Sequence, residues 1–149
     1  MGPRVHHVGI IAGDIERSLR FYREGLGLEV LSDHAVLEGD WPRVFGVSST
    51  RARSLSMGDP KDPSAGVLEL LQFEGPSDPP AAAGAPVQGF LLVSFLNLDL
   101  DAVLSRLRKL GVEPIGRIEG SSPQAAFEMA TVRDPDGVLV ELVGTPRPL

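Results

Sequence analysis

Apolar and polar positions follow the same order twice along the chain. A short apolar run from His7 is followed by Asp14 and a stretch with helical spacing, and the run from Leu92 is followed in the same way by Asp99. In both copies the aspartate stands seven positions after the first residue of the run. Such a repeat predicts a duplicated βα unit. Because one copy has His7 where the other has Leu92, we expect the function to depend on that difference.

Both repeats continue into an amphipathic helix. Asp14 is placed to cap the first helix, and Gly25 or Gly27 to end it. The second helix is expected between Asp99 and Gly111. The residues that define the two apolar stripes are Ile15, Leu19, Tyr22 and Leu26 in the first helix and Leu100, Val103, Leu107 and Leu110 in the second.

The remaining segments are short and rich in apolar or β-branched residues, and turn signals separate them. The clearest are GDPKDPSAG at 58–66 and DPDG at 134–137, of which the second predicts a hairpin. Each half is therefore predicted to be β-α-β-β-β, in a fold of the α+β class. A Pro-, Gly- and Ala-rich linker at 75–88 would divide one domain into module one, about 1–74, and module two, about 89–149.

Segment 40–47, between two predicted strands, carries Trp41 and Phe45. It is expected to be a loop or a short helix. Two placements of the aromatic rings stay open: they lie over an opening of the fold, or a surface loop tucks them into the core.

Composition limits the partners and the compartment. The chain has no cysteine, which rules out disulfides, zinc ribbons and thiol nucleophiles and suits a reducing cytoplasm. The N-terminal segment lacks a signal-peptide pattern, and the longest apolar run, around 90–96, is far shorter than the ~20 residues of a membrane helix. A net charge of −6 and a pI near 5.0 disfavour binding to a phosphate backbone. We expect a cytoplasmic protein that binds neither membranes nor nucleic acid.

Three polar residues occupy strands that are otherwise apolar. Glu69 lies within VLELL, Glu141 within VLVELV and His7 within VHHVGII. Burying an unpaired ionised carboxylate costs several kcal/mol, so each glutamate needs a proton, a salt bridge, a metal ion or a wet cavity. Taken singly, each of the three is more often a salt-bridged, edge or satisfied core residue. Together, one imidazole and two carboxylates on separate strands predict a site for a divalent metal ion with positions left open for water or substrate.

The same residues resemble a known family. HVGI followed by an aspartate, the helix RSLRFYREGLGLEV, the strand VLELL and RDPDGVLVEL are similar to motifs of the vicinal oxygen chelate superfamily, also called the glyoxalase/bleomycin resistance/dioxygenase superfamily. The resemblance covers nearly the whole chain. It implies two βαβββ modules in tandem that form an incomplete barrel with an internal cavity, and it implies a homodimer. It also implies metal ligands on the first and fourth strands of the modules, here His7, Glu69 and Glu141.

Leu92 stands where many metal-using members of that superfamily carry a histidine in the second module. Leucine offers no lone pair, so three protein ligands would remain, with water completing the shell. Two carboxylates and one imidazole shift the expectation from zinc or iron toward manganese, magnesium or nickel. Extradiol dioxygenases and fosfomycin-resistance enzymes rely on a His, His, Glu set, so they fit this chain poorly.

Two function classes stay open. In the favoured enzyme class, a divalent ion (Mn, Ni, Zn, Mg or Fe) would hold adjacent oxygens of a small substrate and stabilise an enediolate or enolate, while Glu141 or Glu69 moves the proton. The protein would then be a glyoxalase-like lyase, isomerase or epimerase. In the binding class, a metal-free cavity with Leu92 in its wall would hold or sequester a small molecule, as bleomycin-resistance-like proteins do. Hydrolase chemistry is not supported, because no G-x-S-x-G elbow contains Ser48, Ser49, Ser54 or Ser56.

Overall fold

The structure is a computed structural model that describes residues 2–62, 64–76 and 88–148. The chain divides into two compact units. The first unit contains Met1–Leu19 and Leu28–Pro79, and the second contains Arg20–Gly27 and Pro80–Leu149. Most of the predicted linker at 75–88 lies outside the described residues.

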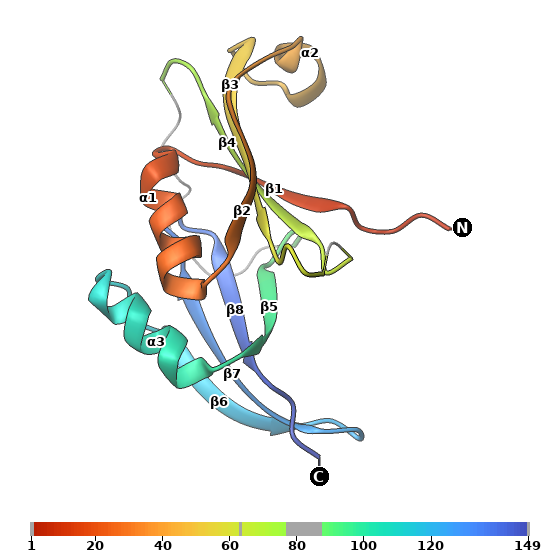
Figure 1. Cartoon of the computed structure of the whole chain (residues 1–149), viewed down its shortest axis with the longest axis vertical. Coiled ribbons are helices and arrows are strands. Elements are labelled where there is room, and N and C mark those ends of the chain that lie inside the picture. Colours follow the sequence, from red (N-terminus) through yellow and green to blue (C-terminus); the bar gives the residue numbers. More distant parts are fainter. Residues whose placement is uncertain (1, 63, 77–87, 149) are drawn as a thin grey trace. The chain divides into compact units, whose positions relative to one another are not determined.

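The first unit is built around a four-stranded sheet. Its strand order is β1-β4-β3-β2, so the first strand of the unit pairs with the last, in parallel, and the other pairs are antiparallel (Figure 1). Helix α1 follows β1, and the short helix α2 connects β2 with β3. The bounds are β1 His7–Ile11, α1 Ile15–Arg20, β2 Glu29–Glu38, α2 Trp41–Phe45, β3 Arg51–Gly58 and β4 Val67–Phe73.

The second unit repeats this plan with the strand order β5-β8-β7-β6 (Figure 1). It also contains η1, a π-helical segment that continues α1. Neither sheet closes on itself, and the predicted α+β class and tandem βαβββ modules are confirmed. The bounds are η1 Phe21–Leu26, β5 Val93–Leu98, α3 Leu100–Lys109, β6 Gly116–Ser121, β7 Ala126–Arg133 and β8 Leu139–Gly144.

Both predicted helices begin at the predicted aspartates. Asp14 Oδ1 accepts hydrogen bonds from the backbone N–H groups of Glu16 and Arg17, at 3.0 and 3.2 Å. At α3, Asp99 Oδ1 accepts from the N–H of Ala102 at 3.1 Å. These bonds satisfy donors that have no partner within the helix itself. Across the described residues, no helix is long and apolar enough to cross a membrane.

The two glycines near the end of the first helix have different roles. Gly27 ends the helix in the left-handed conformation, with φ of 89°. Gly25 lies within η1, where a Cβ atom would come 2.5 Å from Cδ2 of Leu107 on α3. The Gly25 carbonyl also accepts a hydrogen bond from Arg106 Nε at 2.9 Å. Gly25 therefore permits close packing of η1 on α3 and does not end the helix.

Each sheet has a face covered by helix and an opposite face, which we call the open face. Helix α3 lies along one side of the sheet that contains β8 (Figure 1). In β8, Leu142 is fully buried, and Glu141 next to it points to the opposite, open face. In β4, Gln72 accepts a hydrogen bond from the N–H of Ile15 at the start of α1, which marks the covered face. Glu69 is an odd number of positions away and lies on the open face.

Helix α2 holds the two aromatic residues at the surface. Trp41 and Phe45 stack with their ring centroids 5.5 Å apart and an interplanar angle of 14°. Trp41 Nε1 donates to the Leu37 carbonyl at 3.3 Å, whereas Phe45 is 59% exposed. Placement of both rings in the core is therefore wrong, because the short helix directs Phe45 outward.

Candidate functional site

Strand pairing in the first unit brings His7 and Glu69 together. β1 runs parallel to β4 with Gly9 opposite Glu69, and His7 lies two residues earlier on the same face. Gly9 places no side chain between them. The Nε2 atom of His7 is 3.4 Å from Oε2 of Glu69, and the side chains are 45% and 22% exposed. The two groups are thus partly shielded from water but still accessible to a ligand.

Ser54 on β3 binds the other oxygen of Glu69. Its Oγ donates to Oε1 at 2.6 Å, and the residue is only 3% exposed. Sequence reasoning missed Ser54 as part of the site. The signal that could have found it is the alternation of Ser54 and Ser56 with Leu55 and Met57, which places both hydroxyls on one face of the strand.

His6 extends the group toward the start of the chain. Its Nδ1 lies 2.7 Å from Nδ1 of His7. One of these two nitrogens must carry the proton while the other accepts it. The Nε2 atom of His7 stays directed at Glu69. Polar contacts therefore run in sequence from His6 through His7 and Glu69 to Ser54.

Glu141 has the matching position in the second unit. Ser94 on β5 lies opposite Glu141, as Gly9 lies opposite Glu69. Leu92, two residues before Ser94, therefore corresponds to His7 by strand register and is half-buried. Its place in a cavity wall stays a prediction.

The residue Glu141 is half-buried. It has no hydrogen-bond or ion-pair partner among the residues described in its unit. Glu141 belongs to the second unit and His7 and Glu69 to the first, so the convergence of all three in one site stays a prediction.

His7 and Glu69 fit two ligands of a divalent ion. Nitrogen and oxygen ligands lie about 2.0–2.2 Å from zinc, which separates two such atoms by roughly 3.0–3.5 Å. The 3.4 Å between Nε2 and Oε2 falls in that range. Within either unit, the described residues include no group of three or more His, Asp or Glu side chains that could hold a metal ion. A complete site would therefore need a further ligand, which Glu141 is predicted to supply.

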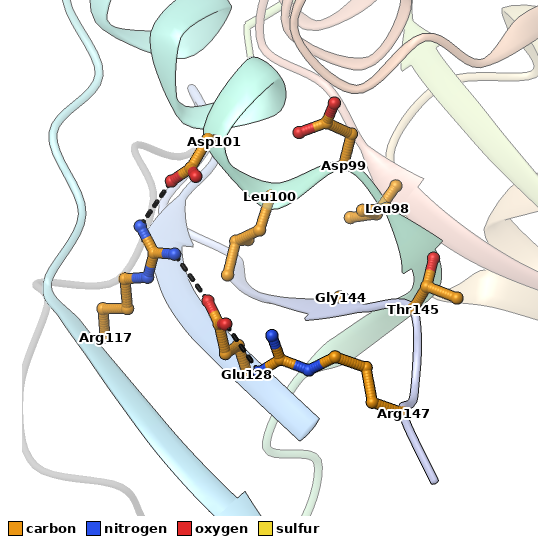
Figure 2. A pocket seen from close by; sticks show the side chains of 9 residues that line it. All are labelled: Leu98, Asp99, Leu100, Asp101, Arg117, Glu128, Gly144, Thr145 and Arg147. Carbon is orange, nitrogen blue, oxygen red and sulfur yellow. Dashed lines mark hydrogen bonds and ion pairs between the residues drawn. The ribbon is translucent and has the colours of Figure 1, made fainter. Parts of the chain in front are cut away.

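A pocket of about 170 Å³ in the second unit is chemically different from this site. Figure 2 shows it beside the start of α3, where Arg117 pairs with Asp101 at 2.7 Å and also with Glu128, and Arg147 pairs with Glu128 at 2.8 Å. The hydrogen bond from Arg117 lowers the pKa of Glu128. These charges satisfy one another, and Glu141 points to the opposite face of the sheet. The pocket is therefore not the predicted metal site.

A buried hydrogen bond between Tyr22 and Asp134 connects η1 to the turn between β7 and β8 within the second unit. The Tyr22 hydroxyl donates to Oδ2 of Asp134 at 2.8 Å. Oδ1 accepts from the N–H group of Asp136, within the predicted DPDG turn, and from that of Val138, directly after it. Burial, followed by the charge of Asp134, raises the pKa of Tyr22. Burial also raises the pKa of Asp134, against the lowering effect of the Tyr22 hydrogen bond. The predicted hairpin is confirmed, and this pair stabilises it.

Known proteins share both the sequence and the fold. Relatives include a lactoylglutathione lyase-like protein, terB, from Aspergillus terreus (strain NIH 2624 / FGSC A1156), which is 35% identical over 151 residues, with 95% of this chain and 75% of that protein covered. A glyoxalase family protein from Bacillus cereus has a TM-score of 0.76 at 28% identity, covering 97% of this chain and 94% of that one. The trypanothione-dependent glyoxalase I of Leishmania major has a TM-score of 0.63 at 26% identity, covering 96% and 87%.

A family model agrees with these similarities. The model described as Glyoxalase/Bleomycin resistance protein/Dioxygenase superfamily matches residues 4–142, from before β1 into β8. With the paired βαβββ units and the relatives above, this match shows that the chain belongs to the glyoxalase/bleomycin resistance protein/dioxygenase superfamily.

Proposed function

We propose that this protein is a glyoxalase-like lyase or isomerase that moves a proton on a small substrate with adjacent oxygen atoms. The observation that carries the proposal is an imidazole nitrogen of His7 and a carboxylate oxygen of Glu69, 3.4 Å apart on the open face of one sheet. Membership in the superfamily and relatives named as lactoylglutathione lyase-like support the reaction class.

His7, Glu69 and Glu141 would hold a divalent metal ion. When bound, the ion would act as a Lewis acid that favours the enediolate or enolate form of the substrate. His7 would offer its neutral Nε2, and Glu69 its Oε2, because these two atoms face each other. Two carboxylates with one imidazole favour manganese, magnesium or nickel over zinc or iron.

Glu141 is the better candidate for the residue that moves the proton. Glu69 already accepts a hydrogen bond from Ser54 and faces His7. Over the described part of the second unit, Glu141 has no hydrogen bond or ion pair, so the lone pairs that are not given to the metal ion would be available to a substrate proton. A general base must come within hydrogen-bond reach of the proton that it removes, which requires the predicted convergence.

The names of the relatives suggest the first substrate to test. Lactoylglutathione carries a hydroxyl group and a thioester carbonyl on adjacent carbon atoms, which matches the required pair of oxygens. Transfer of a proton between these carbons, through the enediolate, interconverts the 2-hydroxy thioester and a hemithioacetal. We propose thioesters of small 2-hydroxy acids, or the isomeric hemithioacetals, as the substrate class.

The test uses protein purified without a chelator. We expect elemental analysis to find a stoichiometric divalent metal, and proton exchange at the carbon next to the thioester of S-lactoylglutathione to be visible by NMR. Both should disappear in Glu69→Gln. Wild-type protein that binds none of manganese, nickel and zinc, and exchanges no proton, would contradict the proposal.

Leu92 supports a second candidate function. An apolar side chain occupies the position that matches His7, and the adjacent Leu91 is 51% exposed. A metal-free pocket with Leu92 in its wall would bind or sequester a small apolar molecule. Fluorescence of a hydrophobic dye that is displaced by apolar compounds but not by metal ions would favour this function over the enzyme.

We also propose a homodimer. Ile11 on β1 and Leu96 on β5 are 53% and 57% exposed, and both strands are at the edge of their sheets. Exposed apolar edge strands are usually covered in native proteins. Sedimentation that shows a monomer at micromolar concentration would contradict this proposal.

A further inference from the structure

Ser54 is a buried hydroxyl whose one hydrogen-bond partner, among the described residues, is Glu69. Ser54 is only 3% exposed in β3, and its Oγ donates to Glu69 Oε1 at 2.6 Å. A buried hydroxyl without a partner costs free energy. The hydrogen bond to Glu69 therefore explains why a polar side chain can occupy this buried position.

The neighbouring serine of the same strand provides a contrast. Ser56 lies directly opposite Glu69 in the antiparallel pairing of β3 with β4, whereas Ser54 lies diagonally, opposite Leu71. Ser56 is half-buried, and none of the hydrogen bonds found in the described residues involves its side chain. The bond to Glu69 thus depends on the position of Ser54 and not on the mere presence of serine in the strand.

Strand register shows that the second unit lacks this hydroxyl. Leu55 lies opposite the residue after Glu69, and Ala130 lies opposite the residue after Glu141. The residue before each of them is Ser54 in one unit and Met129 in the other. Met129 cannot donate a hydrogen bond. Ser54 therefore occurs in the unit that carries His7 and is replaced by Met129 in the unit that carries Leu92.

We infer that Ser54 is a positioning residue that orients the carboxylate of Glu69 for ligand binding. By occupying Oε1, the hydroxyl restricts rotation of the carboxylate and keeps Oε2 directed toward Nε2 of His7. A carboxylate that is already oriented loses less conformational freedom when it binds a metal ion. This inference rests on the proposed function, because it assigns to Glu69 the role of a metal ligand.

The test compares calorimetric titrations of manganese, nickel and zinc into wild-type protein, Ser54→Ala and the matched control Ser56→Ala. We expect Ser54→Ala to bind the preferred ion about 10- to 100-fold more weakly, as is typical when a residue that orients a metal ligand is lost. Ser56→Ala should stay within about twofold of wild type, because its hydroxyl makes no hydrogen bond to Glu69. Ser54→Cys nearly preserves the volume but donates weakly, and it is titrated with manganese, for which a thiol is a poor ligand. It should resemble Ser54→Ala in manganese affinity and wild type in thermal unfolding.

The possible outcomes separate this inference from the proposed function. Metal binding by wild type that is unchanged in Ser54→Ala would overturn the inference alone. A loss of affinity in Ser56→Ala as large as in Ser54→Ala would also overturn it. Wild-type protein that binds none of the three ions would overturn the proposed function and, with it, this role of Ser54. Failure of Ser54→Cys to fold would show that the residue acts in packing and would overturn the inference as well.

Discussion

The open faces of the two sheets share a strand register but differ in their side chains. In the first unit, Glu69 is accompanied by His7 and Ser54. In the second unit, the positions that correspond to these companions hold Leu92 and Met129. Strand pairing depends on backbone hydrogen bonds, so side chains on an open face can differ without altering the sheet. The repeat therefore preserves the arrangement of the strands. The polar cluster of His7, Glu69 and Ser54 belongs to the first unit, and the matching positions of the second unit are apolar except for Glu141.

On the covered faces, the two units carry the same kind of ion-pair cluster, but the arginine and the acid have exchanged strands. In each unit an arginine on the sheet joins an acid near the start of the helix to an acid on the neighbouring strand, an arrangement that we call the ion-pair clasp. In the first unit the arginine is on the third strand of the module, and in the second unit it is on the second strand. The clasps are Glu16, Arg53 and Asp33 in the first unit and Asp101, Arg117 and Glu128 in the second.

The turns that follow the third strand of each module differ in burial. By register, Asp59 corresponds to Asp134, and a proline follows both. Asp59 is exposed and accepts from the N–H of Lys61 at 2.8 Å, whereas Asp134 is buried and also accepts from Tyr22. The two turns therefore have similar local sequences but differ in the burial of their aspartates.

The largest expected effect comes from removing a candidate ligand in the first unit. Glu69→Gln should weaken binding of the preferred divalent ion by at least about 100-fold, since losing a direct ligand exceeds the typical loss of a supporting residue. Calorimetric titration measures the change. The control Glu74→Gln alters an exposed carboxylate that pairs with Arg51 and should leave affinity unchanged. Equal metal affinity of Glu69→Gln and wild type would contradict the role of Glu69 as a ligand and the contrast drawn between the two open faces.

The buried turn should be more sensitive than the exposed one. Tyr22→Phe removes a hydrogen bond to a carboxylate and should lower the free energy of unfolding by about 1.5–3 kcal/mol at neutral pH. Asp134→Ala should likewise destabilise, whereas Asp59→Ala should cost clearly less, because the Asp59 carboxylate is exposed. Urea unfolding followed by circular dichroism measures the three changes. Equal losses for Asp59→Ala and Asp134→Ala would contradict the comparison of the turns.

The pH dependence of the same variant has a definite sign. Burial raises the pKa of Asp134 in the folded protein. The stability that the protein gains from protonating Asp134 is therefore fully present below the unfolded pKa and is lost as pH rises through the folded pKa. The Tyr22 hydrogen bond opposes this effect, so Tyr22→Phe should raise the pKa of Asp134 further. The penalty of Tyr22→Phe should therefore be smaller near about pH 4 than near neutral pH. A penalty that grows on acidification would refute this interpretation.

Introducing an imidazole at position 92 tests whether the open face of the second unit can contribute a metal ligand. If His7, Glu69 and Glu141 form a metal site, Leu92→His should tighten binding of zinc, nickel or manganese by at least about tenfold. The gain should disappear when Glu141→Ala is added. Burying the new ring is expected to cost on the order of 1–3 kcal/mol of stability if it finds no partner. The control Leu96→His places histidine at an exposed position of β5, four residues after Leu92. Weaker binding of an apolar ligand without tighter metal binding would favour the metal-free pocket.

The smallest expected effect concerns the ion-pair clasps. Arg53→Glu should lower the free energy of unfolding by about 1 kcal/mol at low salt, because it places like charges beside Glu16 and Asp33. Adding Asp33→Arg exchanges the charges as in the second unit and should restore most of the loss. The Arg53 hydrogen bond lowers the pKa of Asp33, so the contribution of this pair should be lost as pH falls through that lowered pKa. A double variant no more stable than Arg53→Glu would show that the two clasps are not interchangeable.

Local patterns predicted the elements well because their causes lie within a few residues. Asp14 and Asp99 cap helices whose first turns follow directly, and the DPDG turn depends on the bonds of Asp134 to nearby N–H groups. The choice between Gly25 and Gly27 could not be made in this way. It depends on Leu107 of α3, which is far along the chain and needs the space at Gly25.

The candidate site shows the same limit more sharply. The sequence by itself determined that His7, Glu69 and Glu141 stand in apolar strands, because period-2 patterns and the cost of burying charge are local properties. Only the tertiary structure decided that His7 faces Glu69, that Ser54 and not Ser56 binds its carboxylate, and that Arg53 and Arg117 complete equivalent clasps from different strands. The physical reason is that strand register, set by backbone pairing between distant segments, decides which side chains meet across a sheet.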